Sequence, residues 1–94
     1  MPMKNPSHPG RIVLRDCIEA LNLTIGKAAA HLQVEEDALT AICERRAPIT
    51  ADMAIRFEMA FGSTAHAWLG MQAAYDLAQA RKTACEIKRI ERAA

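Results

Sequence analysis

Apolar residues recur along this chain at intervals of three and four residues, which is the spacing of a helix that buries one face. The first such set is Leu14, Cys17, Ile18 and Leu21. Pro9 stands in the favoured first turn of this helix, and Asn22 can end it in the left-handed conformation. Val, Ile and Thr never alternate over the length of a strand, so the sequence predicts an all-α protein.

The same spacing predicts two short helices in the next part of the chain, separated by Gln33 and Val34. Thr24 can cap the first of them, with inward residues Ile25, Ala28, Ala29 and Leu32. The second runs from about Glu35 to Arg45 before Pro48, with inward residues Ala38, Leu39, Ile42 and Cys43. A small residue in the first helix (Ala29) and an apolar one in the turn describe a helix-turn-helix. Such a pair can hold its second helix in the major groove of DNA.

Two further helices complete the predicted fold. Thr50 can cap the fourth helix and Gly62 can end it, with buried residues Ala54, Phe57, Ala60 and Phe61. Ser63 or Thr64 can cap the fifth, which begins with Trp68 and Leu69 and can continue through Tyr75 and Leu77 to Ile87. We expect residues 1–7 to be a flexible N-terminus. Residues 8–94 are then one domain, with a C-terminal helical extension over about 64–91.

Length and composition are those of one small globular domain. The chain has 94 residues, of which 51% are hydrophobic, and its formal net charge is +1. Because the chain as a whole carries almost no excess of positive charge, binding to a nucleic acid would require basic side chains that cluster on one part of the surface. The sequence has no signal peptide and no apolar run long enough for a membrane span, so we predict a cytoplasmic protein without membrane contact.

The sequence gives little indication of a catalytic or metal-binding site. Cys17, Cys43 and Cys85 lie far apart without a CxxC spacing, which indicates neither a disulfide framework nor a zinc site. Cys17 and Cys43 fall on inward faces and are predicted to be small core residues, whereas Cys85 has no assigned role. The three histidines have no ligand spacing, and no nucleophile or phosphate-loop signature is present. We therefore predict no enzyme activity, no metal and no cofactor.

Six short blocks of residues, taken in their order along the chain, carry a resemblance to a known family. They are His8-Pro9-Gly10, Leu21-Asn22-Leu23-Thr24, Ile49-Thr50-Ala51-Asp52-Met53-Ala54-Ile55-Arg56, Gly62-Ser63-Thr64, Trp68-Leu69-Gly70-Met71-Gln72 and Tyr75-Asp76-Leu77-Ala78. From about Ser7 to Lys82 the chain resembles the HigA-type antitoxins, in the Xre/Cro-like group of helix-turn-helix regulators. The resemblance implies a five-helix, lambda repressor-like DNA-binding domain, a homodimer and repression of its own operon at double-stranded operator DNA. It also implies neutralisation of a HigB-type toxin with the RelE-like RNase fold.

The base-reading positions that the resemblance implies are Glu36, Asp37, Thr40 and Ala41. Carboxylates are repelled by phosphate, but they can accept hydrogen bonds from the N4 amino group of cytosine in the major groove. Thr40 can contact a base edge or a thymine methyl group, and Ala41 offers only apolar contact. The alternative is that the acidic residues only complement the dipole of their helix.

Phosphate contacts are predicted for four residues around this helix. Lys27, Arg45 and Arg46 flank it, and Thr24 places a hydroxyl group and a helix N-terminus nearby. For any one of these basic residues the alternative is an ordinary solvated surface. The sequence also departs from the family here, because Gln33 stands in place of the turn glycine and Glu44-Arg45-Arg46 replaces an Asn-Gly-Lys-type segment.

Helix five carries the candidate dimer interface. Trp68 and Tyr75 lie seven residues apart on one face, so they are either core residues or part of a dimer seam, which the resemblance implies for this helix. Leu69, Met71 and Leu77 on the neighbouring face are equally good candidates. A second function also stays open, since the acidic recognition helix favours an interaction module that binds the toxin but has lost specific DNA binding.

Overall fold

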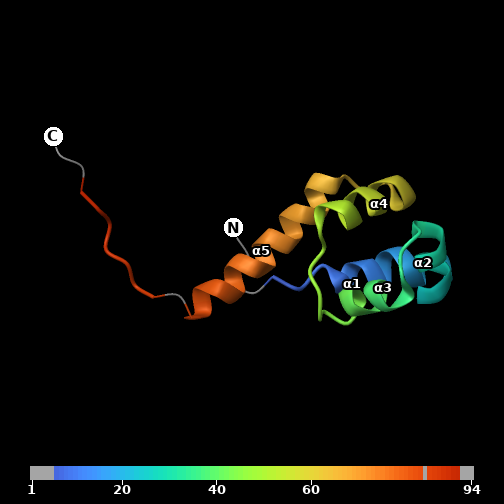
Figure 1. The fold of residues 1–94 in the computed structure, drawn as a ribbon, viewed down its shortest axis with the longest axis horizontal. Helices are drawn as coiled ribbons and strands as arrows, with labels where there is room; N and C mark the ends of the chain where they lie inside the picture. Colours follow the sequence, from blue (N-terminus) through green and yellow to red (C-terminus); the bar gives the residue numbers. More distant parts are fainter. Residues whose placement is uncertain (1–5, 84, 92–94) are drawn as a thin grey trace.

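The computed structural model describes residues 6–83 and 85–91, and its regular elements over these ranges are all helical (Figure 1). In chain order they are α1 (Gly10–Ile12), η1 (Val13–Ile18), η2 (Glu19–Leu21), α2 (Ile25–Leu32), α3 (Glu36–Cys43), α4 (Ala51–Phe61) and α5 (Ala65–Thr83). The first three are consecutive and form one helical segment, so the prediction of five helices is confirmed. Of the predicted flexible N-terminus, residues 1–5 lie outside the described ranges.

The first helical segment departs from simple α geometry. Its middle part, η1, is wound as a π-helix and its last turn, η2, as a 3-10 helix. Asn22 ends it in the left-handed conformation with φ 58°, as the sequence predicts. Because a π turn is wider, the inward face shifts, so that Val13 is fully buried while Leu21 is 59% exposed. The prediction that Leu21 faces inward is therefore wrong.

The helix pair α2 and α3 has the predicted caps and a shorter second helix. The Thr24 hydroxyl oxygen accepts a hydrogen bond from the backbone N–H of Lys27 at 3.1 Å, which fixes the start of α2. α3 ends at Cys43 instead of Arg45, because Arg45 takes the left-handed conformation with φ 65°. Ala38 is exposed, so its predicted inward position is wrong, whereas Leu39, Ile42 and Cys43 are buried.

The boundaries of α4 and α5 follow local capping. The Thr50 hydroxyl accepts from the N–H of Met53 at 3.2 Å, and Gly62 ends α4 with φ 85°. Thr64 is the cap of α5, since its hydroxyl accepts from the N–H of Ala67 at 3.0 Å. α5 ends at Thr83, so the predicted continuation to Ile87 is wrong. A helix gains most of its stability by packing a face, and the last eight residues of α5 have no buried side chain.

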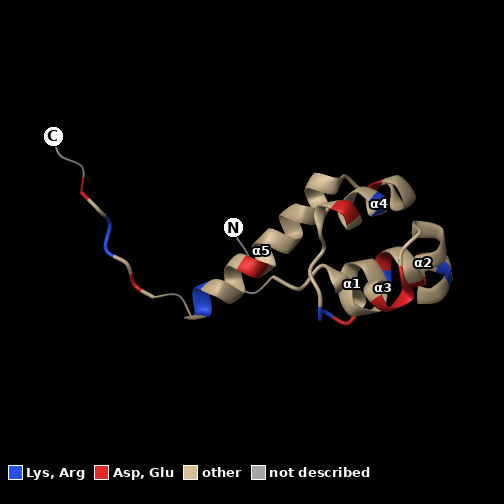
Figure 2. Cartoon of the chain, in the orientation of Figure 1, with Lys and Arg blue, Asp and Glu red and all other residues tan. Residues whose placement is uncertain are grey.

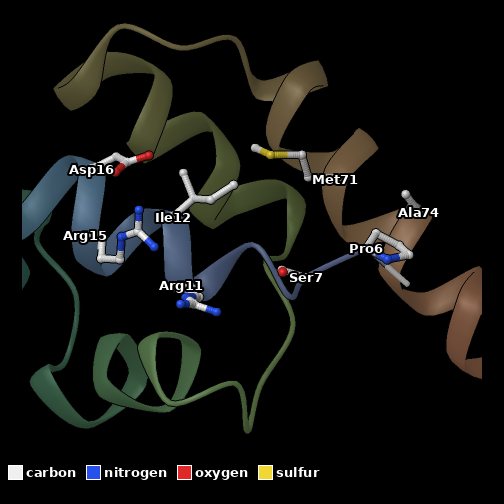
Figure 3. A pocket seen from close by; sticks show the side chains of 8 residues that line it. All are labelled: Pro6, Ser7, Arg11, Ile12, Arg15, Asp16, Met71 and Ala74. Carbon is white, nitrogen blue, oxygen red and sulfur yellow. The ribbon is translucent and has the colours of Figure 1, made fainter. Parts of the chain in front are cut away.

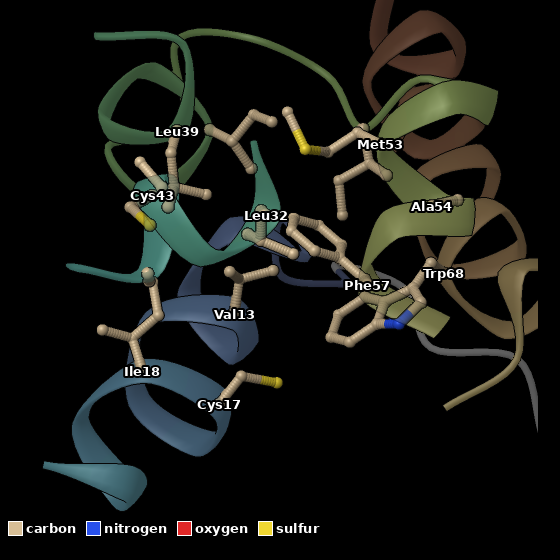
Figure 4. Packing of buried hydrophobic residues seen from close by; sticks show 14 residues of the cluster. Val13, Cys17, Ile18, Leu32, Leu39, Cys43, Met53, Ala54, Phe57 and Trp68 are labelled. Carbon is tan, nitrogen blue, oxygen red and sulfur yellow. The ribbon is translucent and has the colours of Figure 1, made fainter. Parts of the chain in front are cut away.

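The core lies between η1, the α2–α3 pair, α4 and the start of α5 (Figure 4). Phe57 and Trp68 form its aromatic centre, with ring centroids 5.3 Å apart in an edge-to-face arrangement. Cys17 and Cys43 are both buried, which confirms them as core residues. Ala60 and Phe61, predicted to be buried, are only half-buried. Ile49 and Met53 also belong to the core, although the periodicity of the sequence did not select them.

Over the described residues we find neither a membrane-spanning helix nor a cluster of metal ligands. None of the helices there is long and apolar enough to cross a lipid bilayer. Over the same residues, His, Cys, Asp and Glu side chains do not gather into any group of three that could hold a metal ion.

Candidate nucleic-acid interface

α3 presents an outer face that is free of the core. Leu39, Ile42 and Cys43 bury the inner side of the helix. On the opposite side Asp37 is exposed, while Thr40 and Ala41 are half-buried. Three of the four predicted base-reading residues therefore share the outward face, where they can meet the edge of a base pair.

Glu36 lies apart from that face. A Cβ atom added at Gly26, in the first turn of α2, would stand 2.6 Å from its carboxylate oxygen Oε1 and 3.9 Å from the hydroxyl oxygen of Thr24. The carboxylate thus lies beside the N-terminal end of α2, where negative charge is stabilised by the helix dipole. This position suits the dipole role that the sequence left open for Glu36 better than contact with a base.

Arg56 on α4 holds the turn of the helix pair. Its Nη1 atom donates hydrogen bonds to the carbonyl oxygens of Leu32 at 2.7 Å and of Gln33 at 3.3 Å. Its Nε atom donates to Oδ2 of Asp52 at 2.9 Å, within the same helix. The guanidinium therefore satisfies the last carbonyl groups of α2, which no helical N–H can reach. The sequence analysis found Arg56 within one of the blocks shared with the family but gave it no role, since the two carbonyl groups that it binds lie more than twenty residues away.

Gln33 ends α2 in the left-handed conformation with φ 60°, at the position where a glycine is expected. Its N–H donates to the carbonyl oxygen of Ala30 at 3.2 Å, and the N–H of Val34 donates to that of Ala29 at 3.0 Å. These bonds form the usual closing turn of a helix, so the turn keeps its geometry with a side chain present.

Gly10 sets how closely the N-terminal helix approaches α3. A Cβ atom at this position would overlap the carbonyl oxygen of Ile42. The N–H of Gly10 donates to Nδ1 of His8 at 2.9 Å, and the buried His8 ring packs edge-to-face on Tyr75 of α5 at 4.9 Å. Burial lowers the pKa of His8, an effect that Arg45 reinforces and Asp76 opposes. The recognition helix is thereby connected through its inner side to α5.

The predicted phosphate-binding residues lie at the two ends of the helix pair. Figure 2 shows basic residues on α2 and in the loop after α3. Thr24 and Lys27 are exposed at the start of α2, and the Thr24 hydroxyl keeps its own proton to donate after accepting from Lys27. Arg45 and Arg46 are exposed in the loop after α3. Arg46 is already paired, because its Nε and Nη2 atoms donate to Oε1 of Glu44 at 2.9 and 2.7 Å.

α5 brings four of the five predicted interface residues near the surface. Trp68 is 1% exposed, so the core role is confirmed for it, and it has almost no surface to offer a partner. Leu69, Met71 and Tyr75 are half-buried, and Leu77 is 51% exposed. The C-terminal part of α5 extends away from the body of the molecule, as Figure 1 shows.

The chain is similar to several known helix-turn-helix proteins, although no protein-family model matches it. It is 34% identical over 91 residues to the uncharacterized HTH-type transcriptional regulator YbaQ of Escherichia coli, covering 94% of this chain and 80% of that protein. An addiction module antidote protein of the HigA family from Coxiella burnetii superposes with a TM-score of 0.78 at 36% identity, covering 83% of this chain and 85% of that one. The Pseudomonas aeruginosa antitoxin HigA, solved with the higBA promoter, superposes with a TM-score of 0.80 at 31% identity over 83% and 85% of the two chains.

The capped pair of short helices, with a second helix whose outer face is open, defines an Xre-like helix-turn-helix regulator. The similarity extends over nearly the whole chain and includes the helices outside this pair. The chain belongs to the HigA-type antitoxin family. These three relatives are named as a transcriptional regulator, an addiction module antidote protein and an antitoxin.

Proposed function

We propose that this chain is the antitoxin of a type II toxin–antitoxin pair in the cytoplasm. It binds operator DNA as a homodimer, represses its own operon and neutralises a HigB-type toxin of the RelE-like RNase fold. The observation that carries the DNA-binding part is the outer face of α3, which is held in place by Gly10 and Arg56 and is open to a major groove. The solved relative with the higBA promoter supports this reading.

In this proposal the residues on α3 and around it have separate tasks. Asp37 accepts a hydrogen bond from a cytosine, and Thr40 and Ala41 contact base edges or a thymine methyl group. Thr24, Lys27 and Arg45 contact phosphates, which fix the register of the protein without reading sequence. Arg46 adds less to phosphate binding than an unpaired arginine, because Glu44 already compensates its charge.

The homodimer is supported by the part of α5 that has no packing partner within the chain. Only Trp68 and Gln72 of this 19-residue helix are buried. Leu77 is 51% exposed, and Leu69, Met71 and Tyr75 are half-buried beside it. A second copy of α5 would cover these side chains and would place two recognition helices on one face of the DNA.

The second candidate is an interaction module that keeps toxin binding without specific DNA binding. The observation in its favour is the negative charge around the recognition helix, where Glu35, Glu36 and Asp37 are all exposed. Glu44, at the other end of α3, adds a fourth carboxylate close to any approaching phosphate. Such a surface lowers affinity for every duplex.

Fluorescence anisotropy separates the two candidates. Labelled duplex from upstream of the gene is titrated with protein at a salt concentration of about 0.15 M, beside a scrambled duplex of the same composition. We expect the upstream duplex to bind at least about tenfold tighter, which is a difference of about 1.4 kcal/mol. Ala41→Glu should abolish that preference, whereas Ala20→Glu, on an exposed position of η2, serves as the charge-matched control. Equal weak binding to both duplexes favours the interaction module.

A further inference from the structure

Residues 44–50 form the loop from α3 to α4, and they carry the two arginines that follow the recognition helix. In the first half of this loop, the N–H groups of Arg46 and Ala47 donate to the carbonyl oxygen of Ala41, at 2.8 and 3.2 Å. These bonds attach the first half to the end of α3. The second half begins with Pro48, which has no N–H to donate. Its position therefore depends on contacts with another part of the molecule.

α5 supplies the contact that holds the second half of the loop, which runs beside this helix in Figure 1. The N–H of Ile49 donates to Oε1 of Gln72 at 2.8 Å, and the bond is buried. Gln72 is only 5% exposed although its side chain is polar. Because a buried N–H without an acceptor costs free energy, the carboxamide of Gln72 fixes where Ile49 lies relative to α5.

Asp76, one turn further along α5, sets the orientation of that carboxamide. Nε2 of Gln72 donates to Oδ1 of Asp76 at 2.9 Å. An ionised carboxylate accepts hydrogen bonds and donates none, so the amino group of Gln72 faces Asp76 and its oxygen faces the loop. A carboxamide that is satisfied in one orientation only holds the N–H of Ile49 in one position.

α5 also reaches the first half of the loop, through His8. The ring of His8 packs edge-to-face on Tyr75 at 4.9 Å. The segment before His8 lies close to α5, where Pro6 and Ala74 line the same cavity (Figure 3). Burial lowers the pKa of His8, and the positive charge of Arg45 in the loop lowers it further. The loop is therefore in contact with α5 directly in its second half and indirectly in its first.

We propose that Gln72 is a positioning residue for DNA binding, whose carboxamide holds the loop so that Arg45 reaches a phosphate beside α3. The inference rests on the proposed function, in which Arg45 contacts a phosphate. Arg45 is exposed and has φ 65°, a conformation that a residue with a side chain keeps only where its surroundings fix it. Arg46 is already paired with Glu44, so Arg45 is the contact that depends most on the position of the loop.

The slope of log affinity against log salt tests this role, because it reports the number of phosphate contacts. The full chain is titrated against the upstream and scrambled duplexes, well below its temperature of unfolding. Gln72→Met keeps the length of the side chain but removes the acceptor for Ile49. Loss of the Arg45 contact in both subunits should flatten the slope by about 1.8, which is about 0.9 for each contact. Destabilisation alone would lower the folded fraction without changing the slope.

A double-variant cycle shows whether Gln72 acts through Arg45. Arg45→Gln alone should flatten the slope as much as Gln72→Met does, and the two together should flatten it no further. Lys27→Gln, at the other end of the helix pair, is the matched control and should change the slope equally with and without Gln72→Met. Additive effects of Gln72→Met and Arg45→Gln overturn the inference alone. A wild-type slope with Arg45→Gln overturns the proposed phosphate contact and the inference with it.

Two variants of Asp76, which is exposed, keep the inference testable if Gln72→Met does not fold. Asp76→Asn retains an oxygen that can accept from Nε2 of Gln72, whereas Asp76→Leu does not. Both variants remove the charge that acts on His8, so they differ in the acceptor. We expect the wild-type slope with Asp76→Asn and a flatter slope with Asp76→Leu. Equal slopes in the two variants overturn the positioning role of Gln72.

Discussion

Gly10 lies against the backbone of α3, where a side chain of any size would collide with the carbonyl oxygen of Ile42. We expect Gly10→Ala to lower the free energy of unfolding by about 1–3 kcal/mol, as overpacking does in a tight core. Gly70→Ala is the matched control, because nothing lies within 4 Å of a Cβ there. Within a helix that exchange should stabilise by about 1 kcal/mol. Urea denaturation measures both, and two shifts of the same sign would contradict the close contact.

His8 makes stability depend on pH. Its Nδ1 atom accepts from the N–H of Gly10, and a protonated ring cannot accept. Burial holds the pKa of His8 below its usual value of about 6.5, so the unfolded chain binds a proton more readily than the folded one. The contribution of the neutral ring is therefore fully present above about pH 6.5 and is lost as the pH falls through the folded-state pKa.

The measurement for His8 is the free energy of unfolding at about pH 7.5 and about pH 5.5, in wild type and in His8→Asn. Wild type should be the more stable protein at the higher pH, and the difference should shrink at the lower one. His31 and His66 are present in both proteins, so their effects cancel. A difference that is the same at both pH values would show that His8 does not titrate with folding.

At the scale of the elements, Arg56 connects α4 to the end of α2. Arg56→Met keeps most of the side-chain volume but removes the donors to the carbonyl oxygens of Leu32 and Gln33, which should cost about 1.5–3 kcal/mol. DNA affinity should fall as well, because the turn before α3 loses its support. Asp52→Asn removes only the ion pair of Arg56 with an exposed carboxylate and should cost less than about 1 kcal/mol. Thermal unfolding that ranks the two variants the other way would refute this assignment.

The ion pair between Glu44 and Arg46, just after α3, leads to a prediction for DNA binding. Glu44→Gln releases Arg46 from its ion pair and removes a negative charge next to the phosphates. Affinity should rise for all duplexes alike, and the slope of log affinity against log salt should steepen by about 0.9 for each additional phosphate contact. Anisotropy titrations over a range of salt measure both. An unchanged slope would mean that Arg46 makes no phosphate contact even when unpaired.

Asp37→Asn tests base reading by the same helix. The substitution removes a charge that repels phosphate, so affinity for scrambled DNA should rise. Discrimination at one position of each half-site should fall by about 1–3 kcal/mol if Asp37 accepts from a cytosine. Titration of operator duplexes with single base-pair changes measures this loss. Equal tightening on every sequence would leave Asp37 with a helix-dipole role only.

Sequence reasoning located the five helices because the signals that start and stop them are local. Thr24, Thr50, Asn22 and Gly62 each act within three or four residues, and each ends or begins a helix as predicted. The π-helical winding of η1 was missed, since a 3.6-residue period was assumed throughout, and Leu21 was misplaced as a result.

Patterns in the sequence do not predict contacts between residues that are far apart along the chain. The bond from Arg56 to the end of α2 and the bond from the N–H of Ile49 to Oε1 of Gln72, at 2.8 Å, each join residues more than twenty positions apart. The outer face of α3 was predictable from its apolar spacing. The position of Glu36 beside Gly26 was not, because it depends on how closely α2 and α3 pack.

At the scale of the whole molecule, the described chain is more extended than one compact domain. Its radius of gyration is 16.4 Å, against about 13 Å for a compact domain of 100 residues. The excess comes from the outer half of α5 and the segment 85–91, which extend from the body in Figure 1. The outer half of α5 is the part that the proposed homodimer would cover.

Methylation protection of DNA tests the central proposal most directly. Dimethyl sulfate modifies the N7 atom of guanine, which lies in the major groove where α3 is proposed to bind. On the upstream duplex we predict two protected patches about one helical turn apart on one face of the DNA, as a symmetric dimer requires. Ala41→Glu should remove both patches together, while Ala20→Glu should leave them. Protein binding without any protected guanine in the major groove, at concentrations that saturate the DNA, would contradict the proposal that α3 reads the operator.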